Sequence, residues 1–67
     1  MGEPRDIEDG GYMIRVTRQD GYVDIQRLSL VDGHWLVDPD AGLSVWNETI
    51  PDLIKELQAA DEESRDE

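Results

Sequence analysis

The clearest hydrophobic pattern in the chain lies between Thr49 and Ala60. Apolar residues recur there at the three- and four-residue spacing of one helix face, namely Ile50, Leu53, Ile54, Leu57 and Ala60. Thr49 followed by Asp52 resembles a capping box, and Pro51 falls in the first turn, where its missing N–H costs no hydrogen bond. The sequence therefore predicts an amphipathic helix over 49–60. Because about three turns of helix are marginal alone in water, we expect its apolar face to pack against a sheet.

An alternating pattern predicts a first hairpin over residues 12–27. The dipeptide Asp20-Gly21 suits a two-residue type I′ turn, in which both central residues have positive φ. This turn sets Val16 opposite Ile25 and makes one face of the hairpin apolar and the other polar. The apolar face then holds Ile14, Val16, Val23 and Ile25.

A second hairpin is predicted over residues 28–38, because Asp32-Gly33 repeats the turn signal. It sets Leu30 opposite Trp35 and Leu28 opposite Val37. The two leucines have even numbers, whereas the apolar residues of the preceding segment have odd numbers. A bulge near residues 26–27 would place all of them on one face, whereas a straight strand would leave this end of the sheet apolar on both faces. We favour the bulge.

The remaining segments are interpreted from composition. Residues 38–42 (DPDAG) have the composition of a turn, and residues 43–45 predict a short fourth strand. Charge, glycine and proline dominate residues 1–11, which we expect to be a flexible acidic tail with Gly10-Gly11 as a hinge. Five acids in seven residues predict a disordered acidic tail over 61–67. A single α+β domain is thus expected over 12–60.

These elements predict an α+β fold. It consists of a small antiparallel β-meander of three or four strands packed on one C-terminal amphipathic helix. The side chains expected to form the core are Ile14, Val16, Val23, Ile25, Leu28, Leu30, Trp35, Val37, Leu43, Val45, Ile50, Leu53, Ile54 and Leu57.

Length and composition limit the class of protein. The chain has 67 residues and no cysteine, so it forms one small domain without disulfides or thiolate metal ligands. Its longest apolar runs, such as Trp35-Leu36-Val37, are too short for a transmembrane helix or a signal peptide. We therefore expect a cytoplasmic protein that does not bind membranes.

Charge is the most unusual feature of the composition. Seventeen acidic residues against six basic ones give a net charge of −11, which disfavours direct binding to nucleic acid or to an anionic membrane. Three interpretations remain open: a generic acidic protein, a protein adapted to a high-salt cytoplasm, and a mimic whose carboxylates imitate a phosphate backbone. The candidates for such a charged surface are Asp24, Asp38, Asp40, Asp52 and Glu56.

Candidate chemistry is sparse. His34 is the single histidine and falls beside a predicted turn, where it is not part of a catalytic pattern. The Asp38-x-Asp40-x-Gly42 spacing departs from a calcium loop, because its glycine comes too early and the required glutamate is missing. No phosphate-binding glycine loop is present in the sequence. We therefore expect no enzymatic activity, no catalytic residue, no cofactor and no metal site.

A few large side chains are left as candidates for protein contacts, because one sheet and one helix cannot cover them all. The interface candidates are Tyr12, Met13, Tyr22, Leu36 and Trp46. We predict a small acidic, non-catalytic protein–protein interaction or regulatory module whose partner is another protein or a second copy. The alternatives are a nucleic-acid-mimicking inhibitor of a basic nucleic-acid-binding protein, and a small protein adapted to high salt.

The order of elements over residues 12–58, a hairpin, a turn, a strand and a helix reading ETIPDLIKELQ, resembles the C-terminal half of an SH2 domain. The first helix and the phosphate-binding arginine strand of that family have no counterpart in the sequence. The resemblance therefore implies a topology and no function.

Overall fold

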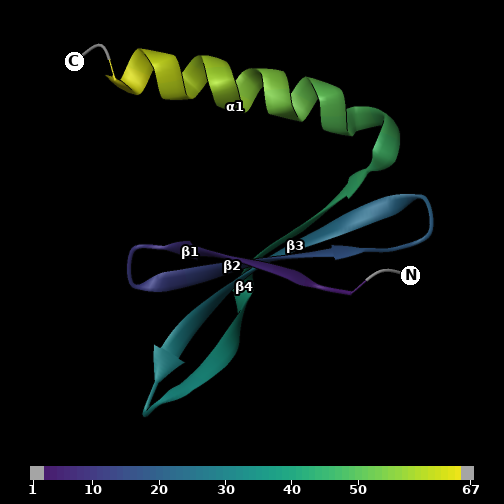
Figure 1. Cartoon of the computed structure of the whole chain (residues 1–67). Helices are drawn as coiled ribbons and strands as arrows, with labels where there is room; N and C mark the ends of the chain where they lie inside the picture. Colours follow the sequence, from purple (N-terminus) through teal and green to yellow (C-terminus); the bar gives the residue numbers. More distant parts are fainter. Residues whose placement is uncertain (1–2, 66–67) are drawn as a thin grey trace.

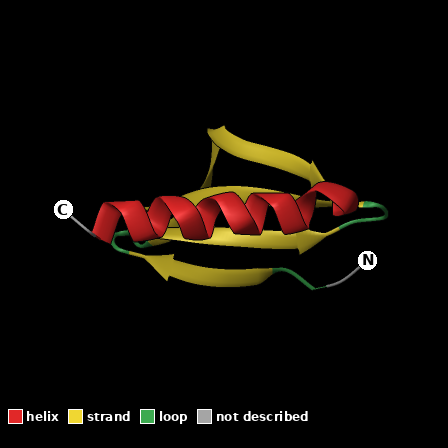
Figure 2. Cartoon of the chain, turned by 90° about the horizontal axis from the view of Figure 1, so that it is seen from above, coloured by secondary structure: helices red, strands yellow, loops and turns green. Residues whose placement is uncertain are grey.

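The computed structural model describes residues 3–65 and confirms the α+β fold class. A four-stranded antiparallel sheet in the order β1-β2-β3-β4 is followed by one C-terminal helix that lies over it (Figures 1 and 2). The elements are β1 (Arg5–Asp9), β2 (Tyr12–Arg18), β3 (Tyr22–Val31), β4 (His34–Trp46), the 3-10 turn η1 (Asn47–Thr49) and α1 (Ile50–Arg65). Within residues 3–65, no helix is both long and apolar enough to cross a membrane.

The registers of both predicted hairpins are confirmed. Val16 on β2 lies opposite Ile25 on β3, and Leu30 on β3 lies opposite Trp35 on β4. These pairings follow from short loops, because a two-residue loop leaves one register for the strands that it joins.

The two turns have different backbone conformations. In the β3–β4 turn, Asp32 and Gly33 have φ of 50° and 81°, as a type I′ turn requires. In the β2–β3 turn, Gly21 has a φ of 85°, whereas Asp20 is not in the positive-φ region. The expectation of positive φ at both residues was therefore wrong for the first hairpin.

The N-terminal segment is a strand where we expected a flexible tail. Residues 5–9 form β1, which pairs with β2 and places Ile7 opposite Ile14. Asp6 also lies directly opposite Arg15, and opposite charges at such positions stabilise a strand pair. Gly10, at φ 62°, belongs to the turn between the strands and is not a hinge. Composition did not reveal this strand, because its stability depends on pairing with β2. Residues 1–2 of the expected tail lie outside the described part.

The predicted irregularity between the two hairpins is present, but its extra residues are on β4. Gln26 pairs with Gly42 and Leu28 pairs with Val37, so Arg27 on β3 faces the whole segment 38–41 on β4. We call residues 38–41 the β4 bulge. This segment is part of strand β4, so the separate turn over 38–42 was wrong. Residues 43–45 are extended as predicted, but they continue β4 and are not a separate strand.

Because β3 pairs with β2 without interruption, the bulge does not bring the apolar residues of β3 to one face. Ile25 therefore lies on one side of the sheet, and Leu28 and Leu30 lie on the other. The favoured arrangement was wrong, and the alternative, a sheet that is apolar on both sides, is the observed one.

Helix α1 is longer than predicted and is not capped as predicted. Thr49 lies inside the 3-10 turn η1, and the residue that precedes this helical segment is Trp46, whose side chain makes no capping hydrogen bond. The helix continues to Arg65, whose Nε donates to Asp61 Oδ1 at 2.9 Å, one turn away. The expectation of a disordered tail was thus wrong for residues 61–65, and residues 66–67 are outside the described part.

The predicted core is mostly uncovered. Leu28 and Val45 are the buried hydrophobic residues of the described part, at 2% and 8% exposure. Six other predicted members are half-buried, and the remaining six are exposed: Leu30, Trp35, Val37, Leu43, Ile54 and Leu57. The radius of gyration is 13.6 Å, whereas a compact domain of this length has about 11 Å. The fold is therefore open.

Candidate protein-interaction surfaces

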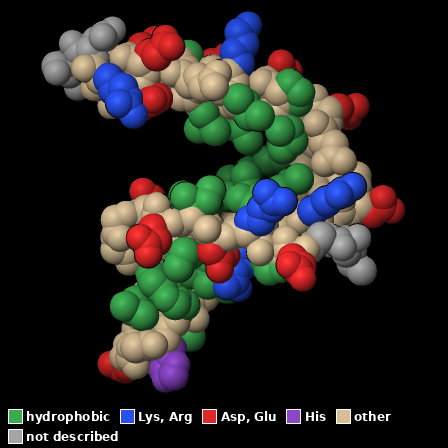
Figure 3. Space-filling view, viewed as in Figure 1, with side chains coloured by type: hydrophobic (Ala, Val, Ile, Leu, Met, Phe, Trp, Pro, Cys, Tyr) green, Lys and Arg blue, Asp and Glu red, His purple; other side chains and the backbone are tan. Residues whose placement is uncertain are grey.

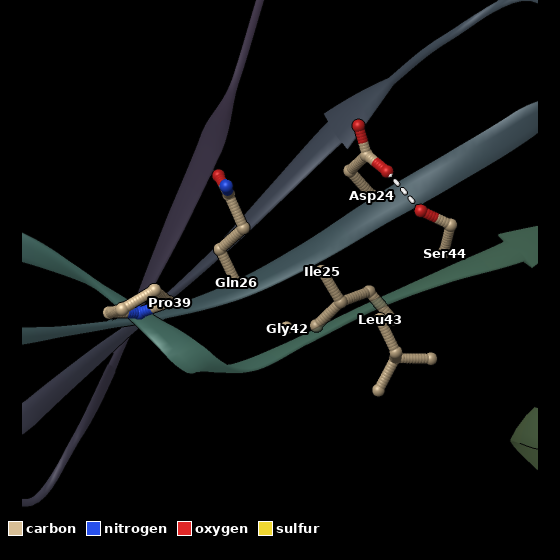
Figure 4. Close-up of a pocket in the computed structure, with 7 residues that line it drawn as sticks. All are labelled: Asp24, Ile25, Gln26, Pro39, Gly42, Leu43 and Ser44. Carbon is tan, nitrogen blue, oxygen red and sulfur yellow. Dashed lines mark hydrogen bonds between the residues drawn. The ribbon is translucent and has the colours of Figure 1, made fainter.

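The sheet has two chemically different sides, defined by the strand register. Face A carries Ile14, Val16, Val23, Ile25, Leu43 and Val45, which lie in adjacent rows on β2, β3 and β4. Face B is polar in its middle, where Arg15, Thr17, Asp24, Gln26 and Ser44 share the surface. In Figure 4, Leu43 points to one side of the sheet while Asp24 and Gln26 point to the other.

A cleft separates α1 from the sheet. Figure 3 shows hydrophobic side chains on both of its walls, meeting at the start of the helix, while the cleft opens toward the C-terminal end of α1. Because the middle of face B is polar, the apolar wall below the helix is face A. We call this space the α1 cleft.

Exposure along α1 rises as the cleft widens. Ile50 and Leu53 are half-buried, whereas Ile54 is 48% exposed and Leu57 is 60% exposed. Leu43, on the opposite wall, is 55% exposed. We call the apolar face of α1, from Ile50 to Leu57, the stripe. A helix gains most of its stability from burying such a face, so the exposed second half of the stripe lacks that contribution within one chain.

A second apolar surface lies at the tip of the β3–β4 hairpin. Leu30, Trp35 and Val37 lie on face B there, and Val31 and Leu36 lie on face A. All five are between 41% and 55% exposed. We call these five residues the hairpin patch, which is divided between the two faces.

The predicted interface candidates do not form one surface. Tyr12 and Leu36 share a row on face A, at 44% and 53% exposure. Met13 is half-buried on face B. Tyr22 and Trp46 pair at the far end of face B, where their rings meet edge to face at 5.8 Å. Trp46 is 63% exposed.

Tyr12 is also the first member of a series of polar contacts that crosses from β2 through β3 to β4. The Arg27 guanidinium lies over the Tyr12 ring, 4.7 Å from its centroid, and Nη2 of Arg27 donates to Oδ2 of Asp38 at 2.9 Å. The backbone N–H of Asp40 donates to the other carboxylate oxygen of Asp38 at 3.2 Å. These two hydrogen bonds lower the pKa of Asp38 below its ordinary value, the bond from Arg27 contributing most.

Two of the charge-surface candidates, Asp24 and Asp38, are engaged in hydrogen bonds within the chain. Asp24 accepts hydrogen bonds from the Ser44 hydroxyl and, at 3.3 Å, from Nε2 of Gln19. Asp52 and Glu56 instead lie exposed, one turn apart on the polar side of α1. The five candidates therefore do not form a single row of free carboxylates.

Two shallow pockets flank β4. One, shown in Figure 4, has a volume of about 440 Å³ and is lined by residues 24–26, Pro39 and residues 42–44. The other, of about 310 Å³, is lined by Tyr22, Ser44 and Trp46. The Asp24 carboxylate in the first pocket already accepts the Ser44 hydroxyl.

The chemistry-bearing residues are dispersed. His34 is exposed at the first position of β4, beside the β3–β4 turn. Over residues 3–65, no group of three or more His, Asp or Glu side chains is arranged to hold a metal ion.

The sequence did not predict the α1 cleft as an exposed surface. It identified the α1 stripe and the alternating strands, yet assigned both to the core. The signal that could have found the cleft is quantitative: a chain with only four aromatic residues has few large side chains to fill the space between one helix and one sheet.

Comparison with protein-family models, curated proteins and solved structures finds no match to this chain.

Proposed function

We propose that this chain is a small acidic, non-catalytic protein–protein interaction module of the cytoplasm that binds through apolar contacts in the α1 cleft. The observation that carries the proposal is the stripe of α1, whose Ile54 and Leu57 stay about half exposed or more above an apolar sheet face. Exposed apolar surface of this extent is typical of docking sites on small proteins.

The charge distribution supports apolar docking over charge mimicry. The stripe residues from Ile50 to Leu57 that face the cleft carry no charge, whereas Asp52, Lys55 and Glu56 lie on the other side of the helix. Acidic groups at the rim and apolar groups in the centre resemble the general composition of protein interfaces.

The test is an affinity capture from lysate of the source cell at low and at high salt. Three baits are compared: the wild-type chain, Ile54→Asp, and a double variant with Asp52→Lys and Glu56→Lys. We expect a partner that is retained at high salt, lost with Ile54→Asp and kept with the double charge reversal, because burying an unpaired aspartate is costly whereas rim charges contribute little.

A different outcome would contradict the proposal. A basic nucleic-acid-binding protein captured only at low salt, and lost with the double charge reversal, would favour mimicry, since exposed charge contacts are screened by salt. Circular dichroism of each bait verifies that the variants keep their secondary structure.

A further inference from the structure

We propose that the occupant of the α1 cleft is a second copy of this chain, whose own α1 enters the cleft so that the two apolar stripes and the two A faces cover one another. This inference rests on the proposed function, because it names the partner of the same surface. The interface would be two-fold symmetric, the commonest arrangement of homodimers.

The exposed area gives the first reason. The chain exposes 5735 Å², whereas a compact monomer of 7.6 kDa exposes about 4,300 Å² by the general relation between surface and mass. The excess is about 1,400 Å² per chain, which exceeds the roughly 800 Å² that each partner contributes to a standard interface. The open fold therefore leaves enough exposed area for a dimer interface of standard size.

The shape of the cleft gives the second reason. It is bounded by one helix and one sheet face, and it opens at the C-terminal end of α1 (Figure 3). Face A contributes Leu43 and the stripe of α1 contributes Ile54 and Leu57, all of them exposed. A helix with an uncharged apolar stripe matches this lining, and α1 of another copy supplies one. Such insertion would cover the stripes of both helices at once.

Size gives the third reason. A domain of 67 residues without disulfides gains little stability from its own core, and this one has two buried hydrophobic residues in the described part. Oligomerisation is a common means of completing such a core. A second copy is also always present where the chain is made.

Charge determines how this dimer responds to salt. Each copy carries a net charge of −11, so two copies repel one another at low ionic strength. Because the stripe is uncharged, added salt screens the repulsion without weakening the apolar contact. The dissociation constant should therefore fall as salt rises, which is opposite to the behaviour of a nucleic-acid mimic.

The experiment measures the mass of the purified full chain by light scattering after size-exclusion chromatography, at several protein and salt concentrations. We expect a mass of twice 7.6 kDa that persists to lower protein concentration as salt is raised. Leu57→Asp should weaken the dimer roughly a hundredfold or more, because the symmetric interface contains the substitution twice. The matched control is Ala59→Asp, which adds the same charge on the opposite side of the same helix turn and should leave the dimer intact at high salt.

Two further measurements keep the outcome decisive if Leu57→Asp fails to fold. Leu57→Ala removes the apolar side chain but keeps a strong helix former, and it should also weaken the dimer. The thermal midpoint of the wild-type chain should rise with protein concentration, as mass action requires for a dimer. A monomeric mass at every salt concentration together with a concentration-independent midpoint would overturn the inference.

Other outcomes separate this inference from the proposed function. A dimer that is broken by Leu36→Asp in the hairpin patch, and not by Leu57→Asp, would place the interface elsewhere and overturn the inference. A monomeric chain that still captures a partner sensitive to Ile54→Asp would leave the proposed function standing and remove only the second copy as occupant.

Discussion

Arg27 on β3 reaches across to Asp38 on β4, with Nη2 and Oδ2 2.9 Å apart, at the point where the two strands lose register. Asp38 is the first residue of the β4 bulge, so this ion pair holds the start of the bulge against β3. The backbone N–H of Asp40 donates to the same carboxylate from within the bulge. The conformation of β4 is therefore linked to the ionisation of one carboxyl group.

The first prediction concerns acid sensitivity at Asp38. The pKa of Asp38 is lowered in the folded chain below its ordinary value of 3.8. The ionised carboxylate therefore stabilises the folded state at a pH above 3.8, and this stabilisation is lost as the pH falls below that value. Asp38→Asn should reduce stability at neutral pH and make the stability less sensitive to acidification below about pH 4. Urea unfolding at a series of pH values measures both effects.

The control for that prediction is Asp40→Asn, which keeps the backbone N–H that Asp38 accepts. It should retain the acid sensitivity of the wild-type chain. Equal acid sensitivity in the wild type and in Asp38→Asn would show that the ion pair does not stabilise the fold.

The second prediction concerns Leu28, the most buried side chain, at 2% exposure. Leu28→Ala should lower the free energy of unfolding by about 2–5 kcal/mol, because it removes buried methyl groups and leaves a cavity. That is a large part of the total stability of a small domain, about 5 kcal/mol at the lower end of the usual range. Denaturant unfolding at a fixed protein concentration measures the loss.

Leu36→Ala is the matched comparison, since Leu36 lies on the neighbouring strand and is 53% exposed. Leu36→Ala should lower the free energy of unfolding by only about 0.5 kcal/mol, as is usual for surface substitutions. Similar losses for the two leucines would contradict the placement of the core at Leu28.

The third prediction concerns the β3–β4 turn. Gly33 has a φ of 81°, and open space surrounds the position of an added Cβ, so Gly33→Ala tests backbone conformation without a steric clash. It should cost about 1–2 kcal/mol, because an L-residue is strained in the left-handed region.

Gly11→Ala is its control, because Gly11 also has open space and is not in the positive-φ region. Replacing glycine in a compatible conformation reduces the entropy of the unfolded chain, so this variant should be neutral or slightly more stable. A thermal midpoint lowered equally by both variants would argue against the I′ conformation of the turn.

The sequence predicted those parts of the fold that depend on near neighbours. The pairs Val16–Ile25 and Leu30–Trp35 follow from two-residue loops and alternation, and the start of α1 follows from its periodic stripe. Strand β1 was missed because its five residues are stabilised by pairing with β2 and by Arg15 opposite Asp6, neither of which composition reveals.

The candidate site was less predictable for a physical reason. Periodicity shows that Ile54 and Leu57 share a face, but not how far that face stands from the sheet. The side of the sheet on which Leu28 lies depends on which strand carries the extra residues. The sequence placed the bulge near residues 26–27, whereas the extra residues are on β4. Burial is a property of the whole arrangement, so the same residues fit a closed core or an open cleft.

The β4 bulge has a consequence for solubility. Strand β4 is an outer strand of the sheet, and a straight outer strand of thirteen residues would offer its free N–H and C=O groups as a template for further strands. Pro39 has no N–H to offer, and the bulge interrupts the regular spacing of the edge. At the opposite edge, β1 is short and carries three acids, Asp6, Glu8 and Asp9. Both borders thus disfavour fibre-like growth by strand addition, although the chain leaves much apolar surface uncovered.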